Sequence, residues 1–107
     1  MEQAFQIAIG RIYQKETPEV NPAYRRFIKR FPCVSCGQTW GIDPCHTGPH
    51  AYARKSSDKS CIPLCRKCHD TFDAAPALFA AARGLDIPAL IQMFNRFWEQ
   101  KQQRSAQ

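Results

Sequence analysis

Cys33-Val34-Ser35-Cys36-Gly37 is matched later in the chain by Cys65-Arg66-Lys67-Cys68-His69. Two intervening residues let both thiolates of a turn converge on one tetrahedral Zn²⁺, and two such pairs complete its four ligands. Gly37 suits the tight turn of a zinc knuckle, and the second pair stands where a helix is expected to begin. A knuckle and a helix start, joined by a β-hairpin or loop, form a treble-clef-like arrangement. The pattern thus predicts a structural zinc site made of Cys33, Cys36, Cys65 and Cys68.

Two further cysteines, Cys45 and Cys61, lie outside these pairs. Three interpretations remain open: each is a buried small apolar side chain, the two meet across the hairpin, or one serves a second metal. All six thiols are expected to stay reduced, because residues 1–10 lack the pattern of a secretory signal peptide. No window has the apolar length that a membrane span needs. We therefore expect a cytoplasmic protein without a membrane association.

The 107 residues fit one domain, residues 1–107, with three parts. A core of about residues 32–73 is rich in Cys, His, Gly and Pro. The N-terminal flank, residues 1–31, is basic: the segment from Phe5 to Tyr13 suits a helix or a strand, and Asn21-Pro22 then caps and starts an amphipathic helix. Helices are expected again within residues 76–100.

In this C-terminal part, Gly84 is expected to end one helix in a left-handed conformation, and Asp86 to cap the next. Residues 100–107 are polar and are expected to fray. The last helix carries an apolar stripe that is most simply part of the core. Its members are Leu90, Ile91, Phe94, Phe97 and Trp98.

The net charge of +6 is concentrated in the two flanks. A basic protein attracts polyanions such as DNA through counterion release, although a solvated face that only aids solubility gives the same pattern. The clearest basic face belongs to the helix that starts at Pro22. The candidate phosphate-binding residues on it are Arg25, Arg26, Lys29 and Arg30.

The histidines suggest a second metal site. His69 directly follows Cys68, so the structural zinc would fix the helix turn that carries it. Asp73 is four residues further on, which places both side chains on one helix face, where they can chelate one cation. His46 is expected on the first strand of the hairpin or at the end of that strand. Hydrolysis of a phosphodiester needs a base and a divalent cation, and this arrangement can supply both.

These motifs, together with the segment Asp43-Pro44-Cys45-His46 and the Lys55-x-x-Asp58 spacing, resemble those of HNH endonucleases over roughly residues 30 to 98. The similarity is greatest to small phage and prophage enzymes, including the recombinase-dependent kind. It implies an α+β fold with a zinc-stapled ββα-metal core and flanking helices. It also implies that His46 is the general base and His69 a ligand of the catalytic metal.

The sequence departs from the family at two positions. Cys45 stands where the family has His, Asp or a small residue before the base, and a thiolate suits Zn²⁺ better than Mg²⁺. The middle Asn of the family has no counterpart, and Ser60 or Asp58 stands nearest. We expect the catalytic metal, Mg²⁺, Mn²⁺ or Zn²⁺, to be held by His69, Asp73 and Cys45.

The resemblance implies a DNA substrate bound with little sequence specificity, a recombinase filament as a further partner, and a phage or prophage origin. Lys55 is then expected to line the DNA groove, and His50 is either a phosphate contact or a loop residue without function. Two alternatives use the same residues: a non-enzymatic zinc module that binds DNA or protein, and a degenerate nuclease that retains only binding.

Overall fold

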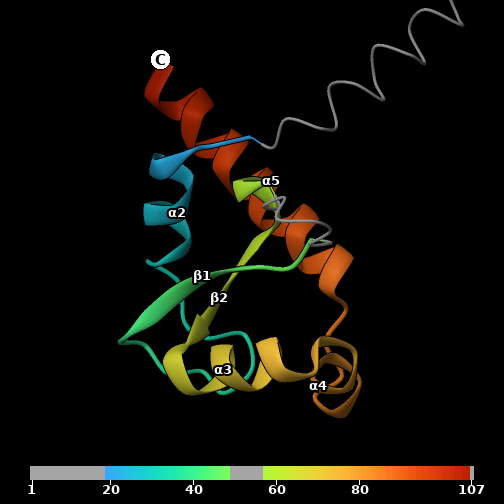
Figure 1. Ribbon diagram of the computed structural model, residues 1–107. Helices are drawn as coiled ribbons and strands as arrows, with labels where there is room; N and C mark the ends of the chain where they lie inside the picture. The colour runs from blue at the N-terminus through green and yellow to red at the C-terminus, as the bar shows by residue number, and fades with distance from the viewer. Residues whose placement is uncertain (1–18, 49–56, 107) are drawn as a thin grey trace, which may run out of the picture.

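The computed structural model describes residues 19–48 and 57–106, and in it a two-stranded antiparallel sheet separates two pairs of helices (Figure 1). β1 (Ile42–His46) pairs with β2 (Cys61–Cys65), and a short 3-10 turn, η1 (Asp58–Ser60), precedes β2. α3 (Arg66–Ala74) continues directly from β2. The predicted small α+β fold, with a hairpin between the cysteine pairs and a helix at the second pair, is confirmed at this level.

The core consists of two clusters, and β2 contributes residues to both. All five residues of β2 are buried, as expected of a strand covered on both faces. Ile62 and Leu64 pack with Phe72 and Phe79 of the helices on one side, whereas Cys61 packs with Tyr24 and Phe94 on the other. The strands also bring Pro44 opposite Pro63, which a two-stranded sheet tolerates because both of its strands are edges.

α2 (Pro22–Ile28) is the predicted amphipathic helix. The Asn21 side chain accepts a hydrogen bond of 3.0 Å from the backbone N–H of Tyr24, and Pro22 occupies the first turn, so the predicted cap is confirmed. Tyr24, Phe27 and Ile28 are buried. The segment from Phe5 to Tyr13 lies outside the described residues.

α4 (Pro76–Ala82) ends as predicted at Gly84, which has φ +64°. The N–H of Gly84 bonds to the carbonyl of Ala81, and that of Leu85 to the carbonyl of Ala80, which is the Schellman pattern. Asp86 then caps α5 (Ile87–Ala106) by accepting from the N–H of Ala89 at 3.1 Å, also as predicted.

One expectation about α5 is wrong, and a second is wrong at a single residue of the apolar stripe, while Leu90, Ile91, Phe94 and Trp98 pack in the core as predicted. The helix does not fray at residue 100 but continues to Ala106, because its last turns consist of good helix formers and Lys101 packs against the aromatic core: its Nζ lies 5.4 Å from the centroid of the Phe27 ring. Within the apolar stripe, Phe94 is 2% exposed, but Phe97 is 38% exposed. Phe97 is therefore not a core residue.

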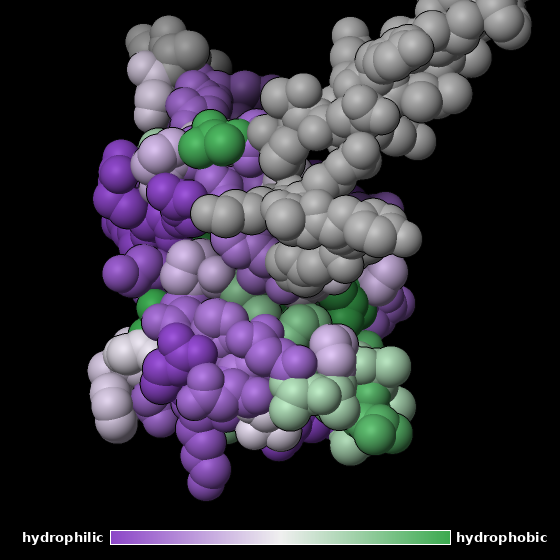
Figure 2. All heavy atoms as spheres, in the orientation of Figure 1, coloured by the Kyte–Doolittle hydropathy of each residue, from purple (hydrophilic) through white to green (hydrophobic). Residues whose placement is uncertain are grey.

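The face of the molecule shown in Figure 2 is mostly hydrophilic, with hydrophobic residues gathered over α4. Leu78 of this helix is 72% exposed. None of the described helices is by itself long and apolar enough to cross a membrane. The segments Pro76–Ala82 and Ile87–Ser105 meet the length and composition limits only together, and they are bent by 86° at the break between them.

Candidate metal centres and the His46 cluster

The two cysteine pairs converge on one point. The Sγ atoms of Cys33, Cys36, Cys65 and Cys68 all lie within 4.8 Å of one another. The Sγ atoms of Cys36 and Cys65 are 3.8 Å apart, which equals the edge of about 3.8 Å expected for a tetrahedron with Zn–S bonds of about 2.3 Å. The four cysteines can hold a metal ion such as zinc.

Local structure explains how each pair is presented. The N–H of Gly37 bonds to the carbonyl of Cys33 at 2.9 Å, and Gly37 has φ +79°, so the predicted tight turn after the first pair is confirmed. The N–H of Val34 bonds to the carbonyl of Pro63 at 3.0 Å, which ties this turn to β2. Cys65 is the last residue of β2 and the N-cap of α3, so Cys68 follows one helical turn later.

The thiols of Cys33 and Cys68 differ in how easily they ionise. Burial opposes ionisation of Cys33, but backbone hydrogen bonds from Cys65, Cys36 and Ser35 lower its pKa to about 7. Burial raises the pKa of Cys68 to about 12. The Ser35 hydroxyl, which is close to this thiol, is buried and has no hydrogen-bond partner within bonding distance among the described residues. A metal-bound thiolate would accept its hydrogen, which is a further sign that these sulfurs suit a metal.

A second cluster joins β1 to α3. One ligand atom each from Cys45, His69 and Asp73 lies within 4.8 Å of the other two. Nε2 of His69 is 3.4 Å from Oδ2 of Asp73, close to the separation expected of two ligands about 2.1 Å from one ion. The structure therefore brings together the three residues that the sequence selected for a second metal. Burial, followed by the Asp73 charge, raises the pKa of the Cys45 thiol to about 12, so a bound cation would have to displace its proton.

Asp43 supports this cluster, and the sequence analysis did not select it as a site residue. Its Oδ2 lies 3.0 Å from Nδ1 of His69 and 2.8 Å from the Arg66 guanidinium. An ionised carboxylate only accepts hydrogen bonds, so Nδ1 donates and the lone pair of Nε2 is left for a metal. Asp43 stands two residues before Cys45, and alternation along a strand puts both on one face. This two-residue spacing could have identified Asp43 as a site residue from the sequence.

His46 belongs to a different cluster. Its Nε2 lies 2.7 Å from Oδ1 of Asp58, and the Cys61 thiol completes a group of possible ligands. Asp58 is buried and also accepts from the N–H of Asn21 at 2.6 Å. Burial opposes ionisation of Asp58, but these bonds and the nearby Arg25 outweigh it and hold the pKa of the carboxyl below its ordinary value.

This network changes the interpretation of Arg25. Its guanidinium lies 3.3 Å from Oδ2 of Asp58, with 39% of the side chain exposed. Arg25 was predicted to bind phosphate, but it is already engaged as the partner of a buried carboxylate. Arg26, Lys29 and Arg30 are exposed, as predicted for the basic face. His50 and Lys55 lie outside the described residues.

The strand register also places the two remaining cysteines. Cys45 is opposite Ile62 and Cys61 is opposite His46, so the two thiols point to different faces of the sheet. Both are free and fully buried. They do not form a pair across the hairpin: Cys45 joins the cluster with His69, and Cys61 the cluster with His46.

These features define a small α+β protein in which four clustered cysteines can hold a metal ion. Comparison with known protein families matches residues 13–99 to the family described as "Protein of unknown function (DUF968)". The match spans most of the chain, so the protein belongs to the DUF968 family. No curated protein and no solved structure matches it. The functional interpretation therefore depends on the clusters described above.

Proposed function

We propose that this protein is a metal-dependent DNA endonuclease of the HNH type, with a treble-clef-like ββα-metal core. The observation that carries the proposal is the convergence of Cys45, His69 and Asp73 on one point beside the four-cysteine cluster. A metal held there would neutralise charge on the scissile phosphate and on the leaving oxygen. Zn²⁺ suits the mixed sulfur, nitrogen and oxygen ligands better than Mg²⁺ does.

In this proposal His46 is the general base. Asp58 accepts a hydrogen bond from the N–H at Nε2, which leaves the lone pair of Nδ1 free to take a proton from water. The buried carboxylate also stabilises the imidazolium that forms. Asp58 thus orients His46. The scissile phosphate is placed at the end of β1, where Cys45 and His46 are consecutive.

One observation favours a second candidate, a zinc module that binds DNA without cleaving it. Consecutive residues of a strand point to opposite faces, and His46 and Cys45 indeed belong to different clusters. A base and a catalytic metal must both reach one phosphate. If the strand keeps this geometry when DNA is bound, the His46–Asp58 pair is purely structural.

Plasmid nicking by purified, zinc-loaded protein separates the two candidates. The variants are His46→Ala, Asp73→Ala and, as a matched control on the same helix, the exposed Asp70→Ala, titrated with Zn²⁺, Mn²⁺ and Mg²⁺ with and without a recombinase filament. We expect His46→Ala to lower the rate by about two to four orders of magnitude at every metal concentration. Asp73→Ala should be partly rescued by more metal, and Asp70→Ala should cleave normally. A wild-type protein that binds DNA and cleaves none of it would establish the zinc-module alternative.

A further inference from the structure

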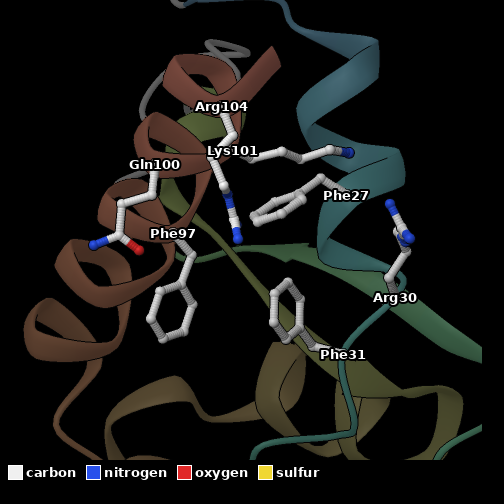
Figure 3. Close-up of a pocket in the computed structure, with 7 residues that line it drawn as sticks. All are labelled: Phe27, Arg30, Phe31, Phe97, Gln100, Lys101 and Arg104. Carbon is white, nitrogen blue, oxygen red and sulfur yellow. The ribbon is translucent and has the colours of Figure 1, made fainter. Parts of the chain in front are cut away.

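A groove lies between α2 and α5, on elements that contribute no ligand to either metal cluster. Its volume is about 480 Å³, which is within the usual range of ligand sites. Three phenylalanines line it: Phe27, Phe31 and Phe97. Four polar residues complete it: Arg30, Gln100, Lys101 and Arg104. Figure 3 shows the aromatic rings reaching into the groove from both sides, with the Lys101 and Arg104 side chains extending from α5.

The aromatic part of the groove is open to solvent. Phe97 is 38% exposed, whereas Phe94, three residues earlier on the same helix, is 2% exposed. The ring of Phe97 lies nearly parallel to that of Phe31, with an interplanar angle of 19° and 6.0 Å between centroids. An exposed flat ring, backed by a second one, is a suitable surface for stacking a planar group.

The charges of the groove have a single sign. Residues 97, 100, 101 and 104 share one face of α5 by helical spacing, and Arg30 approaches from the end of α2. Of the seven lining residues three are cationic and none is acidic. The ammonium of Lys101 lies 5.4 Å from the centroid of the Phe27 ring and 5.9 Å from that of Trp98, which holds this cation beside the aromatic lining of the groove.

We propose that this groove binds a single-stranded segment of nucleic acid. A base stacks on Phe97, and phosphates are held by Arg30, Lys101 and Arg104. Stacking needs an exposed base face, which a duplex hides, so the aromatic lining favours a single strand over a duplex. It also favours nucleic acid over an acidic peptide, whose carboxylates would use the cations but leave the open ring without a planar partner. The inference goes beyond the proposed hydrolysis, because it concerns a separate face of the protein.

Fluorescence anisotropy with labelled oligothymidylate and oligouridylate tests this on the full-length, zinc-loaded protein. Phe97→Leu keeps the apolar bulk but removes the ring, and we expect binding of either strand to weaken about tenfold. Arg104→Gln should reduce the slope of log affinity against log salt by about 0.7, the value for one phosphate contact on a single strand. Arg96→Gln, an exposed arginine of the same helix that does not line the groove, is the matched control and should change neither quantity.

The outcomes are decisive in both directions. If Phe97→Leu binds both strands as tightly as the wild type, or if the wild type binds neither, the proposal is overturned. It is also overturned if oligoglutamate binds with equal affinity and the same dependence on Phe97, which would identify an acidic-peptide site. Oligothymidylate binding by His46→Ala is expected to equal that of the wild type, so loss of cleavage and loss of groove binding can be told apart. Stronger binding of one oligonucleotide than the other would show which of these two strands the groove prefers.

Discussion

Nε2 of His46 and Oδ1 of Asp58 are 2.7 Å apart, and the carboxylate that holds this ring is almost completely buried. Asp58 also receives the N–H of Asn21 and the guanidinium of Arg25. A single carboxylate therefore joins η1 to the end of β1 and the start of α2. Whatever His46 does, its ring orientation depends on Asp58.

Replacing Asp58 should destabilise the protein. Asp58→Ala leaves three donors without an acceptor, and we expect a loss of about 2 kcal/mol in the free energy of unfolding at pH 7. The pKa of Asp58 is lowered in the folded state, so its contribution is complete above the unfolded pKa of about 3.9 and is lost only as the pH falls through the folded value. Urea denaturation of wild type and Asp58→Ala at pH 7 measures this loss in the free energy of unfolding. The exposed Asp70→Ala is the control, and an equal effect of both substitutions would contradict the central role of Asp58.

Affinity of the four-cysteine site for zinc should fall steeply with acidity. The pKa of Cys68 is raised to about 12 and that of Cys36 is also raised, so both thiols carry protons near neutral pH and release them when metal binds. With at least two protons released, affinity should fall about hundredfold per pH unit between pH 8 and 6. Competition with a chromophoric chelator measures the slope. A slope near zero would show that zinc is not bound by thiolates.

Removal of one cluster cysteine should remove both the metal and the fold. Cys33→Ser is expected to lower zinc content by one equivalent and to abolish cooperative thermal unfolding, because the energy of metal binding is here folding energy. Cys61→Ala is the matched control, since Cys61 is buried but outside the four-cysteine cluster. Elemental analysis and circular dichroism should find the zinc retained in the control. Unfolding that stays cooperative in zinc-free protein would refute a structural metal.

Asp43 should raise the metal affinity of the cluster formed by Cys45, His69 and Asp73. Asp43→Asn replaces the carboxylate that fixes the His69 ring with a neutral amide, which is a weaker acceptor, and we expect metal affinity there to fall about tenfold to a hundredfold while the four-cysteine site keeps its zinc. Isothermal titration of zinc-loaded protein with further Zn²⁺ or Mn²⁺ measures the change. Asp70→Asn is the control, because the Asp70 carboxylate shares Arg66 with Asp43 but has no hydrogen bond or ion pair with the His69 ring. Equal affinities in both variants would exclude this role.

Gly84 is expected to contribute to stability only because its backbone conformation favours glycine. It has φ +64°, and an added Cβ would meet no atom within 4 Å, so Gly84→Ala would introduce strain but no clash. We expect a loss of about 1 kcal/mol in the free energy of unfolding, and a smaller loss for Gly84→Asn, because Asn adopts this region more readily. Thermal unfolding of both variants measures the difference. An Ala variant as stable as the wild type would mean that the turn between α4 and α5 rearranges.

The sequence by itself determined the features that depend on near neighbours. Two CxxC spacings predicted the four-cysteine cluster, Asn21 and Asp86 predicted helix starts, and Gly84 predicted a helix end. Each is set by contacts within a few residues, because turns and caps satisfy backbone groups locally. Even the second cluster could be predicted in part from the sequence, since His69 and Asp73 are one helical turn apart.

Only the tertiary structure decided which distant residues meet. The register of β1 on β2 sends Cys45 toward His69 and His46 toward Asp58, and a shift of one residue would exchange them. The same packing pairs Arg25 with Asp58 and turns Asp43 toward His69. It also keeps α5 helical to Ala106, so that Lys101 and Arg104 face Arg30 across a groove. These contacts join residues far apart in the chain, and their geometry depends on how sheet and helices pack, which residue spacing does not specify.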